Sequence, residues 1–294
     1  MDYSRGDLED AFGERFGGFK LLGKGGEGAV FSVYDRVKKV DLALKLSRDS
    51  GDPGHFERFE REYQILAGTR SDRLVRVFEH GRVVIRAGQG SPARHFWYTM
   101  EKCDASVRQT YKTMTLAVRL TVVLQMLDGL ALLHAKNIAH RDIKPENLFL
   151  VTASRGGPSV KIGDFGIATV ARVAPNAVAG AVYGSPAYLA PERWKAESDD
   201  DWRPADQYAA GVTVYELLSL GQPPLDFKPT FEEAHATHPV LPLKIPEMRG
   251  WRLFATDAVI KRMLAKVPEW RHPDVASCKR ELEAALLHDG VTGQ

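Results

Sequence analysis

The strongest chemical signal in the sequence is the octapeptide HRDIKPEN, which begins at His140. Asp142 can accept a proton from a hydroxyl group, and Lys144 can neutralise a phosphate while it is transferred. Asn147 offers an amide oxygen to a hard cation such as Mg²⁺. A solvated turn is the competing interpretation, but a chance polar loop would not usually follow so apolar a segment with this order of groups. We therefore expect phosphate chemistry at these residues.

A second carboxylate follows at Asp164, in the sequence KIGDFG. It stands at the end of an expected strand, near Asn147. A carboxylate at that place suits Mg²⁺, which takes oxygen ligands and keeps substrate phosphates in its shell. An ordinary Asp-x-Gly turn is the alternative. Because the two candidate ligands come from adjacent strand ends, the two motifs support each other.

The third candidate is Lys45, in the sequence LALK of an expected strand. A lysine inside an apolar strand is costly unless it is paired. Glu62, in the helix expected next, is a candidate partner, and the pair can orient Lys45 toward a phosphate. The alternative is a lysine on an edge strand whose ammonium reaches water.

A glycine-rich stretch, GKGGEGAV, precedes these residues and places Gly23, Gly25 and Gly28 in the pattern G-x-G-x-x-G-x-V. Glycines let backbone N–H groups approach phosphate oxygens without a clash. By itself the pattern fits a glycine-rich hairpin turn equally well. It lies between two expected strands, so it does not fit a dinucleotide-binding fold, which needs a helix after the glycines.

Composition restricts the class of protein. The 294 residues, 44% hydrophobic and 27% charged, are enough for one large domain or two lobes with a full core. Lys plus Arg number 40 and Asp plus Glu 38, and a net charge of +2 does not indicate a protein that binds nucleic acid or a membrane surface. The N-terminal segment does not resemble a signal peptide. No run is expected to approach the ~18 apolar residues of a membrane span.

The two cysteines, Cys103 and Cys278, lie far apart in the sequence and lack the spacing of metal ligands. Reduced thiols in a cytoplasmic protein are the simpler interpretation, and one disulfide is the alternative.

The elements that must position these residues change in character near residue 104. Before it, short apolar runs predict strands, and residues 53–68 carry Phe56, Phe59, Tyr63 and Leu66 at helical spacing. After it, residues 115–137 predict a long apolar helix with Thr115 as N-cap. A strand pair and further helices follow. The sequence thus predicts an α+β protein with a small β-rich lobe, which has one main helix, and a larger α-helical lobe.

Taken together, the motifs resemble the catalytic domain of eukaryotic-type (Hanks-type) serine/threonine protein kinases, from about residue 19 to about residue 288. The motifs appear in that family's order and spacing. The resemblance implies a two-lobed kinase fold, with an N-terminal extension at 1–18, an N-lobe at 19–102, a C-lobe at 103–288 and a tail at 289–294. The matching set is the glycine-rich loop, Lys45, HRD with Asn147, DFG at Asp164, APE at Glu192, Asp206 and Arg271.

The resemblance also implies a role for each residue. The glycine loop covers the phosphates of ATP, and Lys45, paired with Glu62, holds the α- and β-phosphates. Asp142 is the catalytic base, with Lys144 beside it, and Asn147 and Asp164 bind Mg²⁺ or Mn²⁺. Asp206 supports the catalytic loop, and Glu192 and Arg271 form a structural ion pair. The implied adenine contacts are Val30, Ala43, Met100, Glu101, Cys103 and Phe149.

Substrate class follows from two features of the resemblance. Lys144, two residues after Asp142, is typical of serine/threonine kinases, and Ser185 in GSPAYLAPE stands where those kinases usually have threonine. The implied substrates are proteins with Ser or Thr acceptors. The chain looks more like bacterial than animal members, and a homodimer or an activating partner is compatible with the resemblance.

Two other functions compete with an active protein kinase. The first is a catalytically weak pseudokinase or scaffold that binds nucleotide and a partner. Its usual sign is loss of the lysine, the base or the metal ligands, all of which this sequence keeps. The second is a small-molecule phosphotransferase, which generally lacks a complete GSPAYLAPE segment.

The segment between Asp164 and Glu192 departs from the family, because no Ser, Thr or Tyr occurs between Val170 and Val182. In many members this stretch carries a Ser or Thr whose phosphate docks on the arginine of HRD, here Arg141. We expect apolar packing of Val173, Val178 or Val182 to order the segment instead. A surface loop without regulatory meaning is the alternative.

Overall fold

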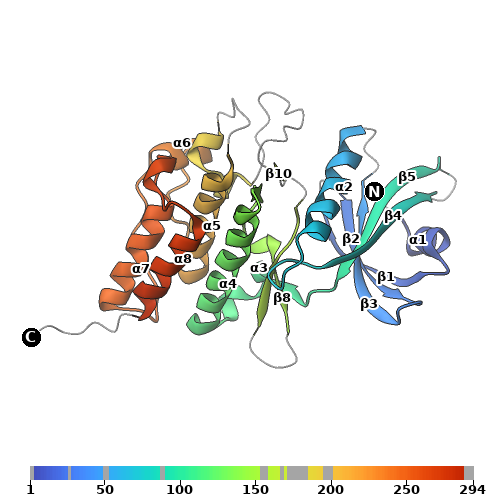
Figure 1. Cartoon of the computed structure of the whole chain (residues 1–294), viewed down its shortest axis with the longest axis horizontal. Helices are drawn as coiled ribbons and strands as arrows, with labels where there is room; N and C mark the ends of the chain where they lie inside the picture. Colours follow the sequence, from blue (N-terminus) through green and yellow to red (C-terminus); the bar gives the residue numbers. More distant parts are fainter. Residues whose placement is uncertain are drawn as a thin grey trace, which may run out of the picture. The chain divides into compact units, whose positions relative to one another are not determined.

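The computed structural model describes residues 3–25, 28–48, 53–86, 90–152, 158–165, 169–170, 185–194 and 201–287. The chain divides into two compact units, whose elements are labelled in Figure 1. The first unit runs to Asp104 and also includes Asp164 and Phe165, whereas the second begins at Ala105. The expected boundary lay two residues earlier, and the grouping of Asp164 with the first unit was not expected.

The first unit is built on an antiparallel five-stranded sheet in the order β1-β2-β3-β5-β4. Its strands are β1 (Phe16–Lys24), β2 (Gly28–Asp35), β3 (Val40–Ser47), β4 (Val77–Ile85) and β5 (Ala93–Glu101). The helix α2 (Pro53–Gly68) packs against β4 and β5. Phe59 lies at the centre of that contact, with its ring 5.6 Å from Phe96 and 5.3 Å from Tyr98. The predicted strands and helix are therefore confirmed.

An additional helix, α1 (Arg5–Phe12), lies in the segment that the sequence analysis treats as an extension. Ser4 and Asp7 form a capping box, in which each side chain accepts a hydrogen bond from the other residue's backbone N–H. Leu8 and Phe12, one turn apart, are buried in the core of the unit, and β1 already begins at Phe16. Within the segment 1–18, Leu8, Phe12 and Phe16 therefore contribute to the core of the first unit.

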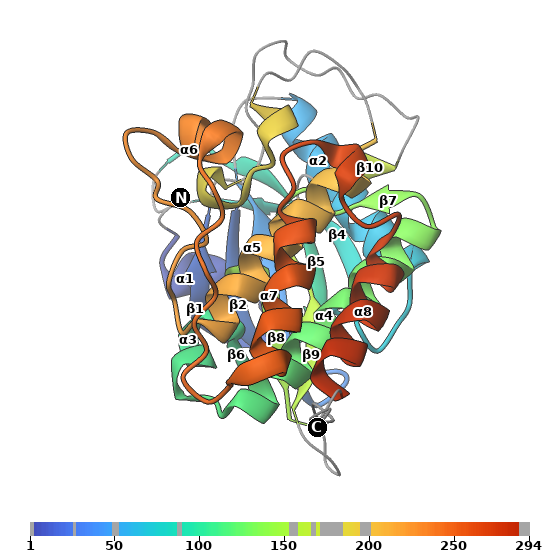
Figure 2. The same ribbon diagram turned by 90° about the vertical axis from the view of Figure 1, so that its left-hand side faces the viewer.

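The second unit is mainly helical and is centred on α4 (Leu116–Ala135), which contacts α5 (Arg203–Leu218) and α8 (Val275–Leu287). Figure 2 shows α7 (Gly250–Met263) and α8 in front, and α7 packs against both α5 and α8. Thr115 caps α4 as predicted, because its hydroxyl accepts a hydrogen bond from the backbone N–H of Val118.

Short elements of the second unit complete the fold. Two small sheets occur, one with the order β6-β8-β9 and one in which β10 pairs with β7. The strands β8 (Leu148–Val151) and β9 (Ser159–Ile162) form the predicted antiparallel pair. The remaining elements are β6 (Ala105–Ser106), α3 (Val107–Thr110), η1 (Tyr111–Thr113), β7 (Ile138–Ala139), η2 (Pro145–Asn147), β10 (Thr169–Val170), η3 (Pro186–Tyr188), η4 (Pro191–Arg193), α6 (Phe231–Thr237) and η5 (Pro268–Trp270).

Helix α4 is, within the described part of the chain, the one helix whose length and composition would allow it to cross a membrane. The sequence analysis expected no such run. Val122, Met126 and Leu130 are fully buried inside the second unit, and Arg119 donates hydrogen bonds to the carbonyl groups of Leu217 and Leu218. Because the central helix of a folded domain meets the same criteria, these contacts identify α4 as a core helix.

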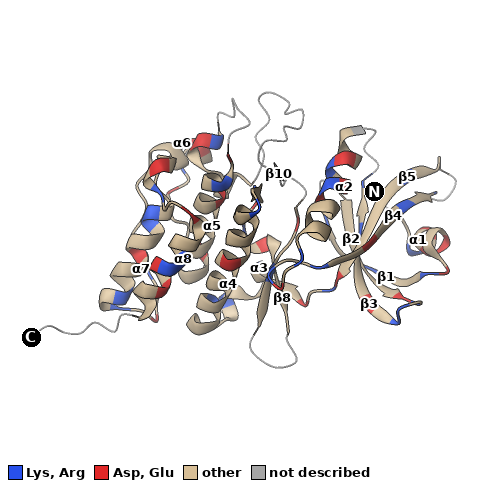
Figure 3. Cartoon of the chain, in the orientation of Figure 1, with Lys and Arg blue, Asp and Glu red and all other residues tan. Residues whose placement is uncertain are grey.

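Charged residues of both signs alternate over the elements of each unit (Figure 3). This distribution agrees with the nearly balanced count of 40 basic and 38 acidic residues.

The role of α1 in the core leads to a stability prediction. Leu8→Ala removes a side chain that is 1% exposed, so it should lower the free energy of unfolding by about 2–5 kcal/mol. Urea denaturation of the whole chain measures this value. The control in the same helix is Arg5→Ala, because the Arg5 side chain is 67% exposed and its solvent-screened surface ion pair with Glu9 adds little to stability. Equal effects of the two substitutions would show that α1 does not stabilise the unit.

Candidate active site

Lys45 and Glu62 form a buried ion pair in the first unit. The Lys45 ammonium donates hydrogen bonds of 2.8 and 2.6 Å to the two carboxylate oxygens of Glu62, and both residues are buried. Burial alone would lower the pKa of Lys45, but the charges of Asp164 and Glu62 outweigh it and hold this pKa well above its ordinary value. Lys45 lies on β3, between β2 and β5, so the edge-strand alternative is wrong. The ammonium is a fixed positive charge that points into the unit.

Asp164 and Phe165, which follow β9 in the sequence, both contact the pair of Lys45 and Glu62. The Asp164 carboxylate lies 3.0 Å from the Lys45 ammonium, yet its side chain remains 49% exposed. The backbone N–H of Phe165 donates a hydrogen bond of 3.0 Å to Glu62. Asp164 itself has a positive φ of 61°, which an aspartate tolerates better than most residues. One carboxylate on α2 thus fixes both the lysine and the backbone that carries Asp164.

The three glycines of the loop have different environments. A Cβ atom at Gly28 would lie 2.1 Å from the carbonyl oxygen of Leu46, so packing of β2 on β3 excludes any side chain there. A Cβ atom at Gly23 or Gly25 would meet no atom of the described residues within 4 Å. The N–H of Gly25 donates a hydrogen bond of 2.8 Å to the carbonyl group of Gly28. Gly28 is therefore required by the sheet, whereas the other two leave backbone open to a ligand.

The residues expected near adenine lie mainly on the strands of the first unit. Val30 pairs with Lys45, and Ala43 pairs with Met100. Glu101 ends β5, where its backbone N–H donates to the carbonyl group of Arg76. Two further candidates are Cys103, which is not in a disulfide and whose thiol lies 4.0 Å from the Glu101 carbonyl oxygen, and Phe149, which lies on β8 of the second unit.

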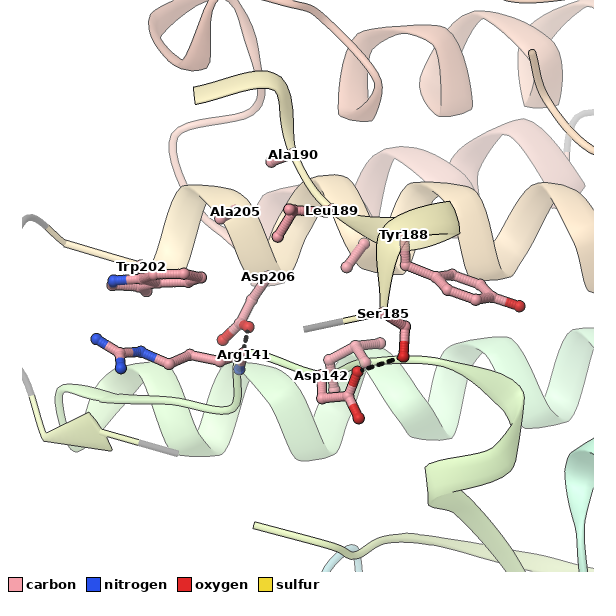
Figure 4. Close-up of a pocket in the computed structure, with 11 residues that line it drawn as sticks. Arg141, Asp142, Ser185, Tyr188, Leu189, Ala190, Trp202, Ala205 and Asp206 are labelled. Atoms are coloured by element: carbon pink, nitrogen blue, oxygen red, sulfur yellow. Dashed lines mark hydrogen bonds between the residues drawn. The ribbon is translucent and has the colours of Figure 1, made fainter. Parts of the chain in front are cut away.

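In the second unit, hydrogen bonds gather around Asp142. One of its carboxylate oxygens accepts from Lys144 at 2.6 Å and from the amide nitrogen of Asn147 at 2.9 Å. The other accepts from the Ser185 hydroxyl at 2.9 Å, and this bond is drawn in Figure 4. Lys144 also donates to the Ser185 hydroxyl at 2.7 Å. Asp142, Lys144, Asn147 and Ser185 therefore form one polar cluster.

The loop that carries Asp142 is held by Asp206 of α5. The Asp206 carboxylate, which is fully buried, accepts hydrogen bonds of 2.7 Å from the backbone N–H groups of His140 and Arg141. Arg141 has a positive φ of 69°, a conformation that costs roughly 1–2 kcal/mol in a residue other than glycine. The N-cap residue of α5 is Trp202, so Asp206 lies inside the first turn of the helix and does not cap it. Asp206 supports the loop, as the resemblance implied.

A small pocket lies between this loop and the segment after Ser185 (Figure 4). Arg141, Asp142 and Ile143 line it from the loop, and Tyr188 and Leu189 line it from the segment after Ser185. Trp202, the residue before α5, and Asp206 within α5 also line it.

Two ion-pair clusters fix that segment. Arg271 binds Glu192 in a bidentate manner at 2.7 and 2.8 Å, so the predicted ion pair is confirmed. Arg108, which the sequence analysis did not single out, donates to Glu146, to Glu216 and to the Tyr188 hydroxyl. Because its partners are far away in the sequence, no local pattern signalled this second cluster.

Asn147 of the second unit and Asp164 of the first unit each carry a side-chain oxygen of the kind that Mg²⁺ binds. The amide nitrogen of Asn147 donates hydrogen bonds to Asp142, and the side chain of Asp164 is 49% exposed. No group of three or more His, Cys, Asp or Glu suited to a metal occurs among the residues described. Mg²⁺ does not require one, since it commonly takes one or two protein ligands and completes its shell with phosphates and water.

The expected packing of Val173, Val178 and Val182 lies outside the described residues, which resume at Ser185. Just before that gap, Thr169 and Val170 form β10, which pairs with Ile138 and Ala139 of β7.

Comparison with known proteins agrees with this geometry. The family model described as protein kinase domain matches residues 16–275. The chain is 33% identical over 289 residues to the serine/threonine-protein kinase Pkn1 of Myxococcus xanthus, which covers 93% of this chain and 39% of that protein. It is 31% identical over 282 residues to the serine/threonine-protein kinase PknB of Mycobacterium tuberculosis. This match covers 92% of this chain and 42% of PknB. The chain thus spans about two fifths of the length of these curated relatives.

The environment of His235 leads to a prediction about pH. His235 of α6 is fully buried and lies 2.8 Å from the Tyr208 hydroxyl. Burial, aided by the charge of Lys266, lowers the pKa of His235 to about 4 from 6.5. Between these values the unfolded chain binds the proton and the native protein does not. Stability should therefore fall as the pH falls from 6.5 to 4, by up to about 1.4 kcal/mol per pH unit from this residue.

Urea denaturation across this pH range, in the wild type and in His235→Gln, measures the contribution. The free energy of unfolding of His235→Gln should depend less steeply on pH than that of the wild type, because the variant lacks the titrating group. Identical pH slopes would mean that His235 binds its proton equally well in the native protein.

Proposed function

The chain belongs to the protein kinase family, and on that premise we propose that it transfers the γ-phosphate of ATP to Ser or Thr hydroxyl groups of protein substrates. The observation that carries the proposal is the cluster around Asp142, in which a carboxylate holds a serine hydroxyl beside a lysine. The same chain keeps the buried pair of Lys45 and Glu62 and the carboxylate of Asp164. Loss of one of these groups is the usual sign of an inactive relative.

Asp142 acts in this proposal as the base that orients the acceptor hydroxyl and takes its proton. Its hydrogen bond to Ser185 supports the role, because it demonstrates that a hydroxyl can sit 2.9 Å from this carboxylate. Lys144, 2.6 Å from Asp142, would stabilise the negative charge on the transferring group. Asn147 keeps the carboxylate in place through its amide nitrogen, and its amide oxygen is assigned to Mg²⁺.

Lys45 acts as a phosphate-binding cation in the first unit, and Glu62 fixes its position. Asp164 is the second magnesium ligand, with Mn²⁺ as an alternative metal. When bound, ATP with its metal supplies the phosphoryl group and neutralises the charge that develops during transfer. Open backbone at Gly23 and Gly25 would receive the phosphates, and Val30, Ala43, Met100, Glu101, Cys103 and Phe149 would contact adenine. We assign the reaction to the cytoplasm, where Cys103 and Cys278, neither of which is in a disulfide, stay reduced.

Substitution of Asp142 tests the assignment of the base. Asp142→Asn should lower kcat at least about 100-fold, since a general base commonly contributes that much. The affinity for ATP should survive, because nucleotide binding and assistance in the transition state are separate contributions. Transfer of labelled phosphate to a protein substrate gives kcat, and calorimetry gives the Kd of ATP.

The matched control is Asp128→Asn, which changes a surface aspartate of α4 that pairs with Lys279. It should leave kcat within about twofold. Near-normal turnover of Asp142→Asn would exclude Asp142 as the base. Tight ATP binding without turnover in the wild type would indicate a scaffold in place of an enzyme.

Substitution of Asp164 tests the metal assignment. Asp164→Ala should abolish the gain in nucleotide affinity that Mg²⁺ provides, because the variant lacks one of two proposed oxygen ligands. Titration with an ATP analogue, with and without Mg²⁺, measures this gain. Asp128→Ala serves as the control and should keep it. An unchanged Mg²⁺ dependence in Asp164→Ala would contradict the assignment.

A further inference from the structure

Trp202, the residue before α5, contacts two arginines through its indole ring. The guanidinium carbon of Arg141 lies 4.3 Å from the ring centroid, and that of Arg193 lies 4.5 Å from it. Figure 4 shows the Arg141 guanidinium beside the indole of Trp202. Trp202 is only 6% exposed and Arg141 is half-buried, so water reaches the indole ring little and the guanidinium in part. A cation is held more strongly by an aromatic face when both are desolvated.

The contact with Trp202 restrains the catalytic loop, because Arg141 belongs to that loop and immediately precedes Asp142. Its backbone N–H is bound by Asp206 and its guanidinium lies over Trp202, so the residue is anchored at both ends. Both anchors belong to the same turn of α5, since the backbone N–H of Asp206 donates to the carbonyl group of Trp202 at 3.0 Å. The backbone at Arg141 has a positive φ, which such anchoring can maintain.

Arg193 extends the contact to the segment after Ser185. It lies in η4, directly after Glu192, and donates a hydrogen bond of 2.6 Å to the carbonyl group of Asp201. Glu192 is in turn held by Arg271. At the start of α5, Trp202 thus contacts Arg141 of the loop with Asp142 and Arg193 of η4.

The sequence adds a reason why an aromatic residue is needed at this place. A phosphate on the segment between Asp164 and Glu192 could bind Arg141, but no Ser, Thr or Tyr occurs between Val170 and Val182. An indole ring requires no modification to bind a guanidinium group. It can therefore hold Arg141 permanently.

We propose that Trp202 is a positioning residue that holds Arg141, and through it Asp142, in the geometry needed for phosphoryl transfer, in place of a phosphate on the segment between Asp164 and Glu192. This inference rests on the proposed role of Asp142 as the base. It differs from simple core packing of Trp202, which would affect stability and not the catalytic step.

Substitution of the indole tests the proposal through kinetics. Trp202→Leu should lower kcat about tenfold or more, as expected for the loss of a partly desolvated cation–aromatic contact, while the KM for ATP stays within about twofold. Trp202→Phe should restore most of kcat because it keeps an aromatic face. The control is Trp270→Leu, since Trp270 is 70% exposed, and its kcat should be unchanged. Equal kcat in Trp202→Leu and the wild type, or no recovery in Trp202→Phe, would overturn the proposal.

A double variant tests whether Trp202 acts through Arg141. In the Arg141→Met background, Trp202→Leu should cause no further loss of kcat, because the contact is already absent. A further tenfold loss would overturn the proposal and would point to Arg193 as the relevant partner. Thr169→Ala removes the one acceptor that directly precedes Val170, and it should keep the wild-type kcat. Inactivation by Thr169→Ala would also overturn the proposal.

A spectroscopic measurement separates failure of this inference from failure of the proposed function. Arg141→Met should shift the tryptophan emission of the whole chain, because a positive charge leaves the face of Trp202, and the shift should vanish in the Trp202→Phe background. This readout needs no turnover. If the wild type is inactive but Arg141→Met shifts the emission, the proposed function is refuted and the contact between Trp202 and Arg141 is supported. An active wild type without the shift would refute the role of Trp202.

Discussion

The active-site geometry of the second unit depends on one buried carboxylate, that of Asp206. It accepts hydrogen bonds from two consecutive backbone N–H groups, those of His140 and Arg141, and so fixes the direction in which the loop leaves β7. A buried carboxylate is tolerated only where such donors satisfy it. The loop and helix α5 are therefore mutually required: the loop supplies the donors, and the helix supplies the rigid support. Asp142, one residue beyond, is held in turn by Lys144, Asn147 and Ser185.

The first unit uses the same principle with another carboxylate. Glu62 of α2 holds the ammonium of Lys45 and the backbone N–H of Phe165, so a helix packed on the sheet determines the place of a strand residue and of a distant segment. The apolar contact of Phe59 with Phe96 and Tyr98 places α2 where this is achieved. In both units, hydrophobic packing of a helix positions a carboxylate, and the carboxylate then positions the groups that carry the chemistry.

Much of this arrangement was predictable because its signals are local. The hydrophobic periodicity predicted the strands around Lys45 and the long helix capped by Thr115. The motif HRDIKPEN places Asp142, Lys144 and Asn147 within eight consecutive residues, so their proximity could be expected. Helix α1 was missed because its signal is weak: a capping box that uses Asp7 in place of the usual Glu or Gln, followed by only two buried side chains. The alternative of an edge strand for Lys45 could be rejected only when the strand order was known.

The sequence by itself determined which groups the protein has for the proposed phosphoryl transfer, because their types and spacing along the chain carry that information. Only the tertiary structure decided what holds them. The contact of Trp202 with Arg141, and the cluster of Arg108 with Glu146, Glu216 and Tyr188, join residues that are far apart in the sequence. Such contacts arise from the way α5 packs beneath the catalytic loop, and no local pattern encodes the distance between two side chains that meet only after the helices have packed.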